Sequence, residues 1–131
     1  MFGFSSQKQL RKAQNSTFHA GDVWGYQTRP HETQSTFFVW RVETLPDGDN
    51  VVHIQLRGLQ ITGGPQGIIE EAGHLPVAET ALSESATRKI SGGEAQPLPE
   101  GYELWRRAWE EGRAGVFSIP LREIVDGLET K

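Results

Sequence analysis

The sequence predicts an α+β domain with a strongly twisted or partly closed antiparallel sheet of about four to five strands and about two to three helices. Apolar, aromatic and β-branched runs occur early in the chain, at 22–29, 35–43 and 51–57, and indicate successive antiparallel strands. Helical periodicity begins only after residue 76. Strands gathered first and helices later, with a short apolar run at 116–119 returning to the sheet, are typical of the α+β class.

Alternation along the three early runs separates an apolar face of the sheet from a polar one. The side chains that we expect on the core side are Trp24, Tyr26, Phe38, Trp40, Val42, Val52, Ile54 and Leu56. The opposite side carries polar residues such as His53, which we expect to be solvated. A Pro-Asp-Gly-Asp-Asn segment at 46–50 predicts a hairpin between the second and third strands.

The remainder of the chain predicts one more short strand, a long loop and three helices. Residues 59–62 continue as a strand, after which a glycine-rich stretch begins an irregular loop over 62–76. Apolar residues at every fourth position predict a helix over 76–90, and an aromatic stripe predicts a second helix over 99–112. Pro120 begins a third helix.

Length and composition indicate a single domain. A chain of 131 residues has the usual size of one domain, and we expect residues 1–20 to form a flexible basic arm ahead of a domain over 21–131. The absence of cysteine excludes disulfides, thiolate metal sites and catalytic thiols. The chain also lacks an apolar stretch of the length of a signal peptide or a membrane helix, so we expect a soluble cytoplasmic protein without a membrane partner.

The formal net charge is −4, and the charges are unevenly placed. All 17 acidic residues follow position 21, whereas Lys8, Arg11 and Lys12 precede it. A folded body of this sign repels phosphates, so we expect no nucleic-acid partner. One hypothesis for the function is therefore an acidic protein that neutralises a basic partner.

Three short motifs stand out along the chain. The pattern G-D-V-W-x-Y-x-T-R-P-x-E-x-x-S occupies residues 21–35. Gly-His-Leu-Pro follows at 73–76, and Gly-x-Ala-Gly-Val-Phe-x-Ile-Pro at 112–120. A chain with these motifs resembles a family of small bacterial proteins of unknown function over about residues 18–128. The resemblance implies a bacterial source and a single α+β domain, and it implies no catalytic residue.

The connection at 28–34 carries the first candidate ligand-binding residues. Arg29, His31 and Glu32 place a guanidinium, an imidazole and a carboxylate close together in a loop between two strands. An arginine there would bind a carboxylate or phosphate through two parallel hydrogen bonds, with Glu32 as a base or as the partner that orients it. The structural alternative is that Arg29 pairs with Glu32 or caps loop carbonyls.

His74 is the second candidate, because it lies close to the expected start of the 76–90 helix. The positive end of a helix lowers the pKa of an imidazole, and the neutral ring then acts as a general base or binds an anion beside the helix end. The structural alternative is a histidine hydrogen-bonded to the backbone at a loop-to-helix junction. Glu70 and Glu71 lie nearby, but Gly73 interrupts any helix, so we expect no metal site. No motif for a cofactor is present.

No motif is specific enough to name a reaction, so two further hypotheses stand beside the first. The leading one is a binding domain that recognises a protein or an anionic small molecule through the 28–34 and 62–76 loops, with Arg29 and His74 in one cleft. The other is a small hydrolase or lyase. In it, His74 is the general base, Arg29 holds an acid group, and Glu32 or Glu71 orients it or donates a proton.

Overall fold

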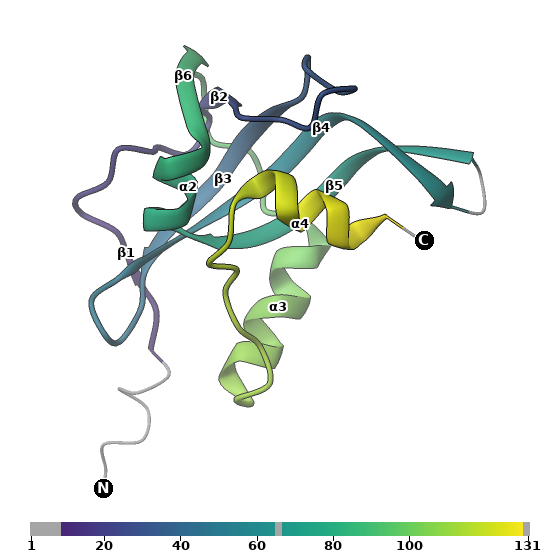
Figure 1. The fold of residues 1–131 in the computed structure, drawn as a ribbon. Helices are drawn as coiled ribbons and strands as arrows, with labels where there is room; N and C mark the ends of the chain where they lie inside the picture. Colours follow the sequence, from purple (N-terminus) through teal and green to yellow (C-terminus); the bar gives the residue numbers. More distant parts are fainter. Residues whose placement is uncertain (1–8, 65–66, 130–131) are drawn as a thin grey trace, which may run out of the picture.

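The computed structural model describes residues 9–64 and 67–129, and these adopt the α+β class that the sequence predicts (Figure 1). The strands are β1 (Arg11–Lys12), β2 (Val23–Tyr26), β3 (Thr36–Thr44), β4 (Asn50–Gly64), β5 (Gly67–Ala78) and β6 (Ala86–Ser91). The helices are α2 (Glu79–Ser85), α3 (Glu100–Glu110) and α4 (Leu121–Leu128). The six-stranded sheet is antiparallel, with the order β5-β4-β3-β2-β6, and β1 pairs with β3 beside β2. It stays open, because β5 and β6 do not pair.

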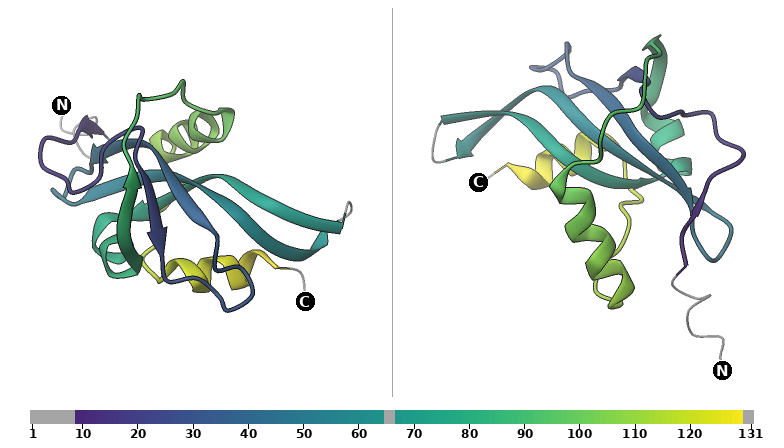
Figure 2. Two further views of the ribbon diagram at one scale, coloured as in Figure 1. Left: turned by 90° about the horizontal axis from the view of Figure 1, so that it is seen from above. Right: turned by 180° about the vertical axis from the view of Figure 1, so that it is seen from behind.

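The helices cover opposite faces of the sheet (Figure 2). α2 and α4 pack on the face that holds the hydrophobic core, which we call the core face, and α3 crosses the other face, which we call the outer face. Core residues include Phe18, Tyr26, Phe37, Val39, Val52, Ile54, Leu56, Val77, Leu82, Leu121 and Val125. None of the helices within the described residues is long and apolar enough to cross a membrane.

The hairpin between β3 and β4 is confirmed. β3 ends at Thr44 and β4 begins at Asn50, with the polar segment between them as the turn. Leu45 N donates to Asp49 O over 2.7 Å, and Gly48 adopts a φ of +96°. Glycine reaches this left-handed region without a Cβ clash, which explains its place in the turn.

β3 contains a β-bulge at Trp40 that simple alternation does not anticipate. Positions 39 and 41 pair with adjacent positions of β4, so Trp40 is an extra residue in the strand. Val39 and Val42 both enter the core, whereas Trp40 lies on the outer face. The expected core position of Trp40 is therefore wrong, because one inserted residue exchanges the two faces of the strand. Phe38 is buried as expected, at 5% exposure, but it packs against Trp40 and lies outside the core cluster.

Residues 62–64 and 67–76 belong to β4 and β5, so the long loop expected over 62–76 is wrong within the described residues. β4 extends to Gly64, and β5 returns along it as the edge strand. The end of β4 and the start of β5 project beyond the helices (Figure 1), and Ile68 and Ile69 of β5 are 54% and 40% exposed. Since this part of β5 meets solvent on both faces, its sequence lacks the apolar alternation that identifies a strand.

The helix expected over 76–90 is wrong over most of its length. α2 ends at Ser85, and the chain then enters β6, which pairs with β2. Ile90, the last residue of the expected apolar stripe, is 47% exposed. The edge of β2 offers backbone partners to β6, and this tertiary pairing overrides the local helical pattern. The two later helices are confirmed, and α3 and α4 follow Pro99 and Pro120 at their N-termini.

The late strand expected over 116–119 is reduced to a single bridge. Phe117 pairs in parallel with Val77, and Phe117 N donates to Pro76 O over 2.9 Å. The chain therefore returns to the sheet at one residue only before it enters α4.

Residues 9–20 pack against the sheet and do not form the expected flexible arm. Arg11 pairs with Thr44 of β3, and the side chains of Leu10 and Phe18 are buried. Two apolar residues this far apart give no periodic pattern, so the sequence offers no signal for their burial. Residues 1–8, the remainder of that arm, lie outside the described residues.

The segment between β6 and α3, residues 92–99, forms a strap that presses on the chain just before β2. Gly21 has a φ of +97°, and a Cβ at this position would lie 2.2 Å from Gly93 O. Gly48 has nearly the same φ, +96°, but a Cβ there would meet nothing within 4 Å. A comparison of substitutions at Gly21 and Gly48 therefore separates the cost of backbone strain from the cost of a clash with the strap.

We predict that Gly21→Ala destabilises the protein more than Gly48→Ala does. Each substitution puts alanine into the left-handed region at a cost of about 1 kcal/mol, and only Gly21→Ala also forces the strap away, for a total of at least about 3 kcal/mol. Urea unfolding would give both free energies of unfolding. Equal losses for the two variants would show that the strap does not constrain Gly21.

Candidate functional site

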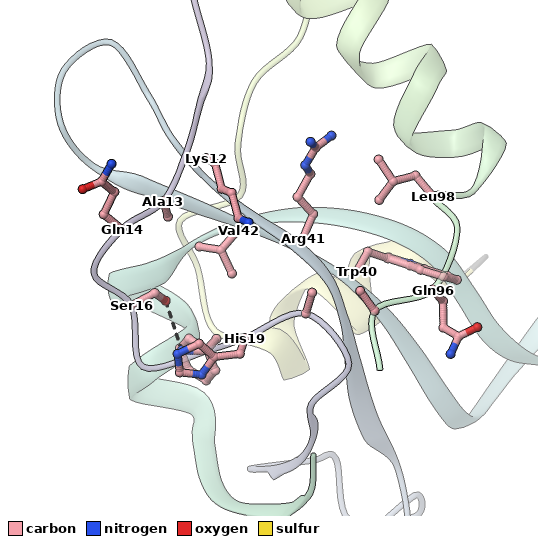
Figure 3. Close-up of a pocket in the computed structure, with 13 residues that line it drawn as sticks. Lys12, Ala13, Gln14, Ser16, His19, Trp40, Arg41, Val42, Gln96 and Leu98 are labelled. Carbon is pink, nitrogen blue, oxygen red and sulfur yellow. Dashed lines mark hydrogen bonds between the residues drawn. The ribbon is translucent and has the colours of Figure 1, made fainter. Parts of the chain in front are cut away.

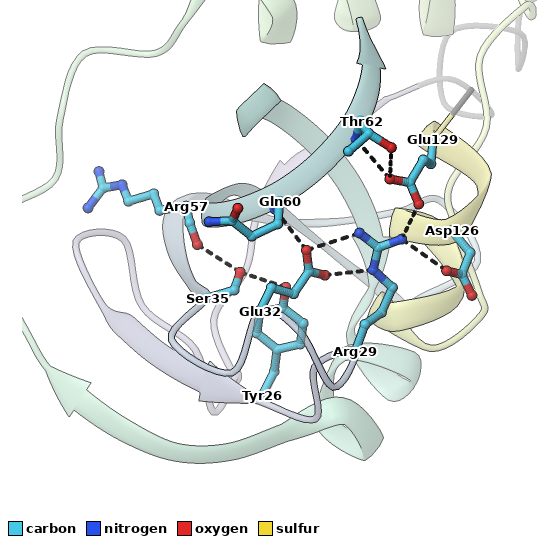
Figure 4. Close-up of polar contacts among 9 residues, drawn as sticks. All are labelled: Tyr26, Arg29, Glu32, Ser35, Arg57, Gln60, Thr62, Asp126 and Glu129. Carbon is cyan, nitrogen blue, oxygen red and sulfur yellow. Dashed lines mark hydrogen bonds and ion pairs between the residues drawn. The ribbon is translucent and has the colours of Figure 1, made fainter. Parts of the chain in front are cut away.

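Arg29 is buried among carboxylates at the start of the 28–34 connection (Figure 4). Its Nε and Nη2 donate to Glu32 over 2.9 and 3.1 Å, and its Nη1 donates to Asp126 and Glu129 over 3.1 and 2.8 Å. Arg29 and Glu32 are 5% and 3% exposed. The pairing of Arg29 with Glu32, the structural alternative, is therefore confirmed, and all three guanidinium nitrogens already have partners.

The same carboxylates also bind the backbone of β4. Glu32 accepts a hydrogen bond from Gln60 N over 2.9 Å, and Glu129 accepts from Thr62 N over 2.8 Å. The hydrogen bonds from Thr62 N and from Arg29 lower the pKa of Glu129 to about 2. These contacts fasten the 28–34 connection, β4 and the end of α4 to one another, which is a structural role.

Arg29 and His74 do not share a cleft. Arg29 contacts α4 on the core face, whereas His74 lies against α3 on the outer face, with the sheet between them (Figure 2). His31 is exposed and has no polar partner among the described residues. Glu71 lines an open hollow beside Trp40 and makes no hydrogen bond or ion pair with His74. The expected convergence of these candidates is therefore not formed.

His74 ends a chain of hydrogen bonds that begins at a buried carboxylate. His53 Nε2 lies 2.9 Å from Glu43 Oε1, and His53 Nδ1 lies 2.9 Å from His74 Nε2. An ionised carboxylate only accepts, so His53 carries its proton on Nε2 and its Nδ1 accepts from His74. For two neutral rings, this assignment leaves His74 Nδ1 as the unprotonated nitrogen. His74 thus bonds to a second histidine, and the expected bond to the backbone is not the one formed.

Burial keeps both imidazoles neutral at pH 7. It lowers the pKa of His53, and it lowers the pKa of His74 to about 4, with a smaller contribution from the positive charge that a protonated His53 would place beside it. Burial alone would raise the pKa of Glu43, but hydrogen bonds from His53 and Tyr102 and the charge of Arg41 outweigh it and lower that pKa. His53 is fully buried, so its expected solvation is wrong: α3 covers it.

Tyr102 of α3 covers the network on the outer face and bonds to Glu43. Its hydroxyl donates to Glu43, at 3.0 Å from each carboxylate oxygen, and accepts from Arg41 Nη1 over 3.2 Å and from Arg106 Nη1 over 3.0 Å. Burial and the neighbouring Glu43 raise the pKa of Tyr102, so the hydroxyl keeps its proton. Among the described residues, no buried side-chain nitrogen or oxygen lacks a partner.

The network does not form a metal centre. No group of three histidine, aspartate or glutamate side chains with suitable geometry occurs within residues 9–64 and 67–129. The chain Glu43–His53–His74 is linear, and the two imidazoles point a nitrogen at each other across 2.9 Å. That separation suits a shared proton and leaves no room for an ion between the rings.

A pocket of about 490 Å³ opens beside this network, where the chain leaves the edge of β3 between β1 and β2 (Figure 3). Its lining residues are Lys12, Ala13, Gln14, Ser16, Phe18, His19, Ala20, Trp40, Arg41, Val42, Ala95, Gln96 and Leu98. We call it the edge pocket. Its volume is within the range of small-molecule sites, and none of these lining residues is acidic.

The cations of the edge pocket keep donors available. Lys12 is exposed and has no hydrogen bond or ion pair among the described residues. Arg41 uses Nη1 for Tyr102, and its Nε lies 3.8 Å from Glu43 Oε2, beyond hydrogen-bond distance. The side chain of Arg41 is 40% exposed. Arg41 therefore joins the buried network to the pocket and still presents N–H groups to an occupant.

Sequence reasoning missed Lys12, Trp40 and Arg41. Lys12 lies in the expected arm, and regular alternation places Trp40 in the core. The available signal was that Val39 and Val42 are both apolar across an interval of three, which a bulge explains and regular alternation does not.

No protein-family model, curated protein or solved structure matches this chain. The resemblance to a bacterial family therefore stays a prediction.

We predict that Arg29→Met destabilises the fold by about 3–5 kcal/mol, because it leaves the buried carboxylate of Glu32 without its cation. The double variant Arg29→Met/Glu32→Met should be more stable than Arg29→Met alone. Urea unfolding of the single and double variants measures the coupling. Arg122→Met, at an exposed arginine of α4, is the control and should change stability by less than about 1 kcal/mol. A loss in Arg29→Met no larger than in this control would contradict a structural role.

We predict that acidification destabilises the wild-type protein through His74. The unfolded imidazole titrates at its ordinary pKa of 6.5 and the folded one near 4, so the unfolded state binds more protons between these values. The free energy of unfolding therefore falls as pH drops from about 6.5 to about 4, by at most about 2 kcal/mol for a partly exposed ring.

His74→Gln should flatten this pH dependence, whereas His31→Gln, at an exposed site, should preserve it. Nitrogen NMR of the wild-type protein at pH 7 should show His74 unprotonated at Nδ1. Equal pH dependence in all three proteins would contradict the proposed origin of the effect.

Proposed function

We propose that this protein is a binding domain for an anionic small molecule, held in the edge pocket and not between the 28–34 and 62–76 segments. The observation that carries the proposal is the charge of the lining. The chain has a formal net charge of −4, yet the described residues that line the pocket include the cations Lys12 and Arg41 and no acidic residue. A local excess of positive charge on an acidic protein favours anions at that one place.

The shape and composition of the pocket support a small ligand. Apolar side chains, among them Phe18, Val42 and Leu98, supply surface for burial, and a few cationic groups supply orientation. This combination is typical of small-molecule sites. A basic groove for an extended polyanion would instead need a continuous row of cations.

Arg41 is held in place before any ligand arrives. Tyr102 accepts a hydrogen bond from it, and the guanidinium also lies over the Tyr102 ring, 5.6 Å from the centroid. A guanidinium fixed in this way loses less side-chain entropy when it binds a carboxylate or phosphate. The arrangement therefore supports Arg41, in place of Arg29, as the anion-binding arginine.

A second candidate function, acid–base catalysis by His74, is favoured by the chain Glu43–His53–His74. A carboxylate that fixes the tautomer of an imidazole is a recurring device for general bases. The hydrolase or lyase hypothesis keeps His74 in this role and loses Arg29 as the acid-holding group. The tautomer measurement at His74 also tests it, because a proton on Nδ1 at pH 7 would remove the base.

We predict that Lys12→Met weakens anion binding about tenfold, because it removes a charged hydrogen-bond donor from the pocket. The probes are acetate, benzoate and phenyl phosphate, ranked by thermal shift and then titrated by calorimetry. Arg11→Met is the matched control: it removes the same charge from the neighbouring position of β1, and Arg11 does not line the pocket. Arg11→Met should change the affinity by less than about twofold.

Two results would count against the proposal. An equal effect of both substitutions would indicate general charge attraction and no site at Lys12. Retention of benzamide as tight as that of benzoate would indicate an apolar pocket that does not select anions.

A further inference from the structure

Trp40 presents a fixed aromatic surface to the edge pocket. Its Nε1 donates to Gly73 O over 2.9 Å, and Phe38 packs edge-on against it with 5.0 Å between the ring centroids. The only polar atom of the indole is therefore already bonded, and the ring cannot turn without breaking that bond. What it offers to an occupant is its aromatic surface, next to Leu98 and Gln96 of the strap (Figure 3).

The charges around the pocket suit an anion of one negative charge. The groups concerned are the cations Lys12, Arg41 and Arg106 and the carboxylates Glu43 and Glu110. Glu43 Oε2 lies 3.8 Å from Arg41 Nε and 3.5 Å from Arg106 Nη1, and Arg106 Nε also lies 3.2 Å from Glu110. Asp22, which lies 3.8 Å from His19 Nδ1, is compensated by Lys89, whose Nζ lies 3.3 Å from its Oδ1. One positive charge is left uncompensated, which matches a carboxylate better than a doubly charged phosphate.

We propose that the edge pocket binds an aromatic monocarboxylate. The aromatic part lies against Trp40 and Leu98, and the carboxylate binds Arg41 and Lys12. Lys12 of β1 pairs with Glu43 of β3, and Glu43 is two residues after Arg41 in the same strand. The two cations therefore lie on neighbouring strands at one end of the site. This assignment rests on the proposed function and adds the chemical class of the ligand.

Four probes separate the contributions of ring and charge: 1-naphthoate, neutral 1-naphthamide, acetate and 1-naphthyl phosphate. Calorimetric titration of the full chain at pH 7.5 should give an affinity for 1-naphthoate at least about tenfold above that for each of the other three. Trp40→Leu should weaken 1-naphthoate binding about tenfold and leave acetate unchanged. Trp109→Leu, at a half-buried tryptophan outside the pocket, is the control and should bind as the wild-type protein does.

A measurement on the unmodified protein covers the case in which Trp40→Leu fails to fold. In proton–nitrogen NMR spectra, 1-naphthoate should shift the indole N–H signal of Trp40 and leave that of Trp109 in place. An unchanged Trp40 signal at saturating 1-naphthoate would overturn the inference.

The remaining outcomes distinguish this inference from the proposed function. Acetate bound as tightly as 1-naphthoate, with loss in Lys12→Met, would overturn the aromatic assignment and leave anion binding intact. Tighter binding of 1-naphthyl phosphate would overturn the single-charge assignment in the same way. 1-Naphthamide bound as tightly as 1-naphthoate, with no effect of Lys12→Met, would overturn both. No heat and no shift with 1-naphthoate at 5 mM would overturn the aromatic assignment, and the anion panel would then decide the proposed function alone.

Discussion

The bulge at Trp40 is the constraint on which the outer face depends. In a regular strand, Val39 and Arg41 would share one face, and the core would have to accept a guanidinium. With one residue inserted, Val39 and Val42 both enter the core, and Trp40 and Arg41 both lie outside it. An aromatic ring and a cation thus become neighbours at the edge pocket, where alternation alone would have separated them.

The arrangement of the outer face also depends on Glu43, whose orientation results from the same β3–β4 register. After the bulge its side chain points to the outer face, where α3 buries it to 3% exposure. A carboxylate in that position is stable only with several donors, and His53 and Tyr102 supply them. Glu43 therefore holds α3 against the sheet through its hydrogen bond with Tyr102, and Tyr102 in turn accepts a hydrogen bond from Arg41. The position of Arg41 in the pocket thus depends on the contact between α3 and the sheet.

The sequence predicts those parts of the fold in which local pattern and tertiary environment agree. The 46–50 turn, the alternation of Val52, Ile54 and Leu56, and the two later helices belong to this group. The failures occur where the environment changes within one element. The first half of β5 is exposed to solvent on both faces of the strand. β6 has a helical pattern of apolar residues but forms a strand, because it pairs with the edge of β2. Neither condition is visible in a local window.

For the candidate site, the sequence predicts the protonation state of a residue better than the residues that it contacts. His74 is a neutral imidazole as expected, but its partner His53 lies on another strand, and the burial that lowers its pKa comes from α3. Lys12 reaches the pocket only because a segment without periodic pattern pairs with the end of β3. Contacts of this kind depend on residues far apart in the chain, and no short motif encodes them.

Arg29 and Arg41, two of the arginines that face acids in this fold, show why local composition does not identify an anion site. Arg29 looks functional in the sequence because it stands beside His31 and Glu32, yet Nε, Nη1 and Nη2 all donate to carboxylates of the same chain. Arg41 sits in an ordinary apolar run, yet it makes one hydrogen bond and keeps 40% of its side chain exposed. A buried guanidinium that is already saturated would have to break those bonds to bind a ligand, at the cost of uncovering buried acids. Donor saturation, which is a property of the folded chain, therefore separates the structural arginine from the one that is available to a ligand.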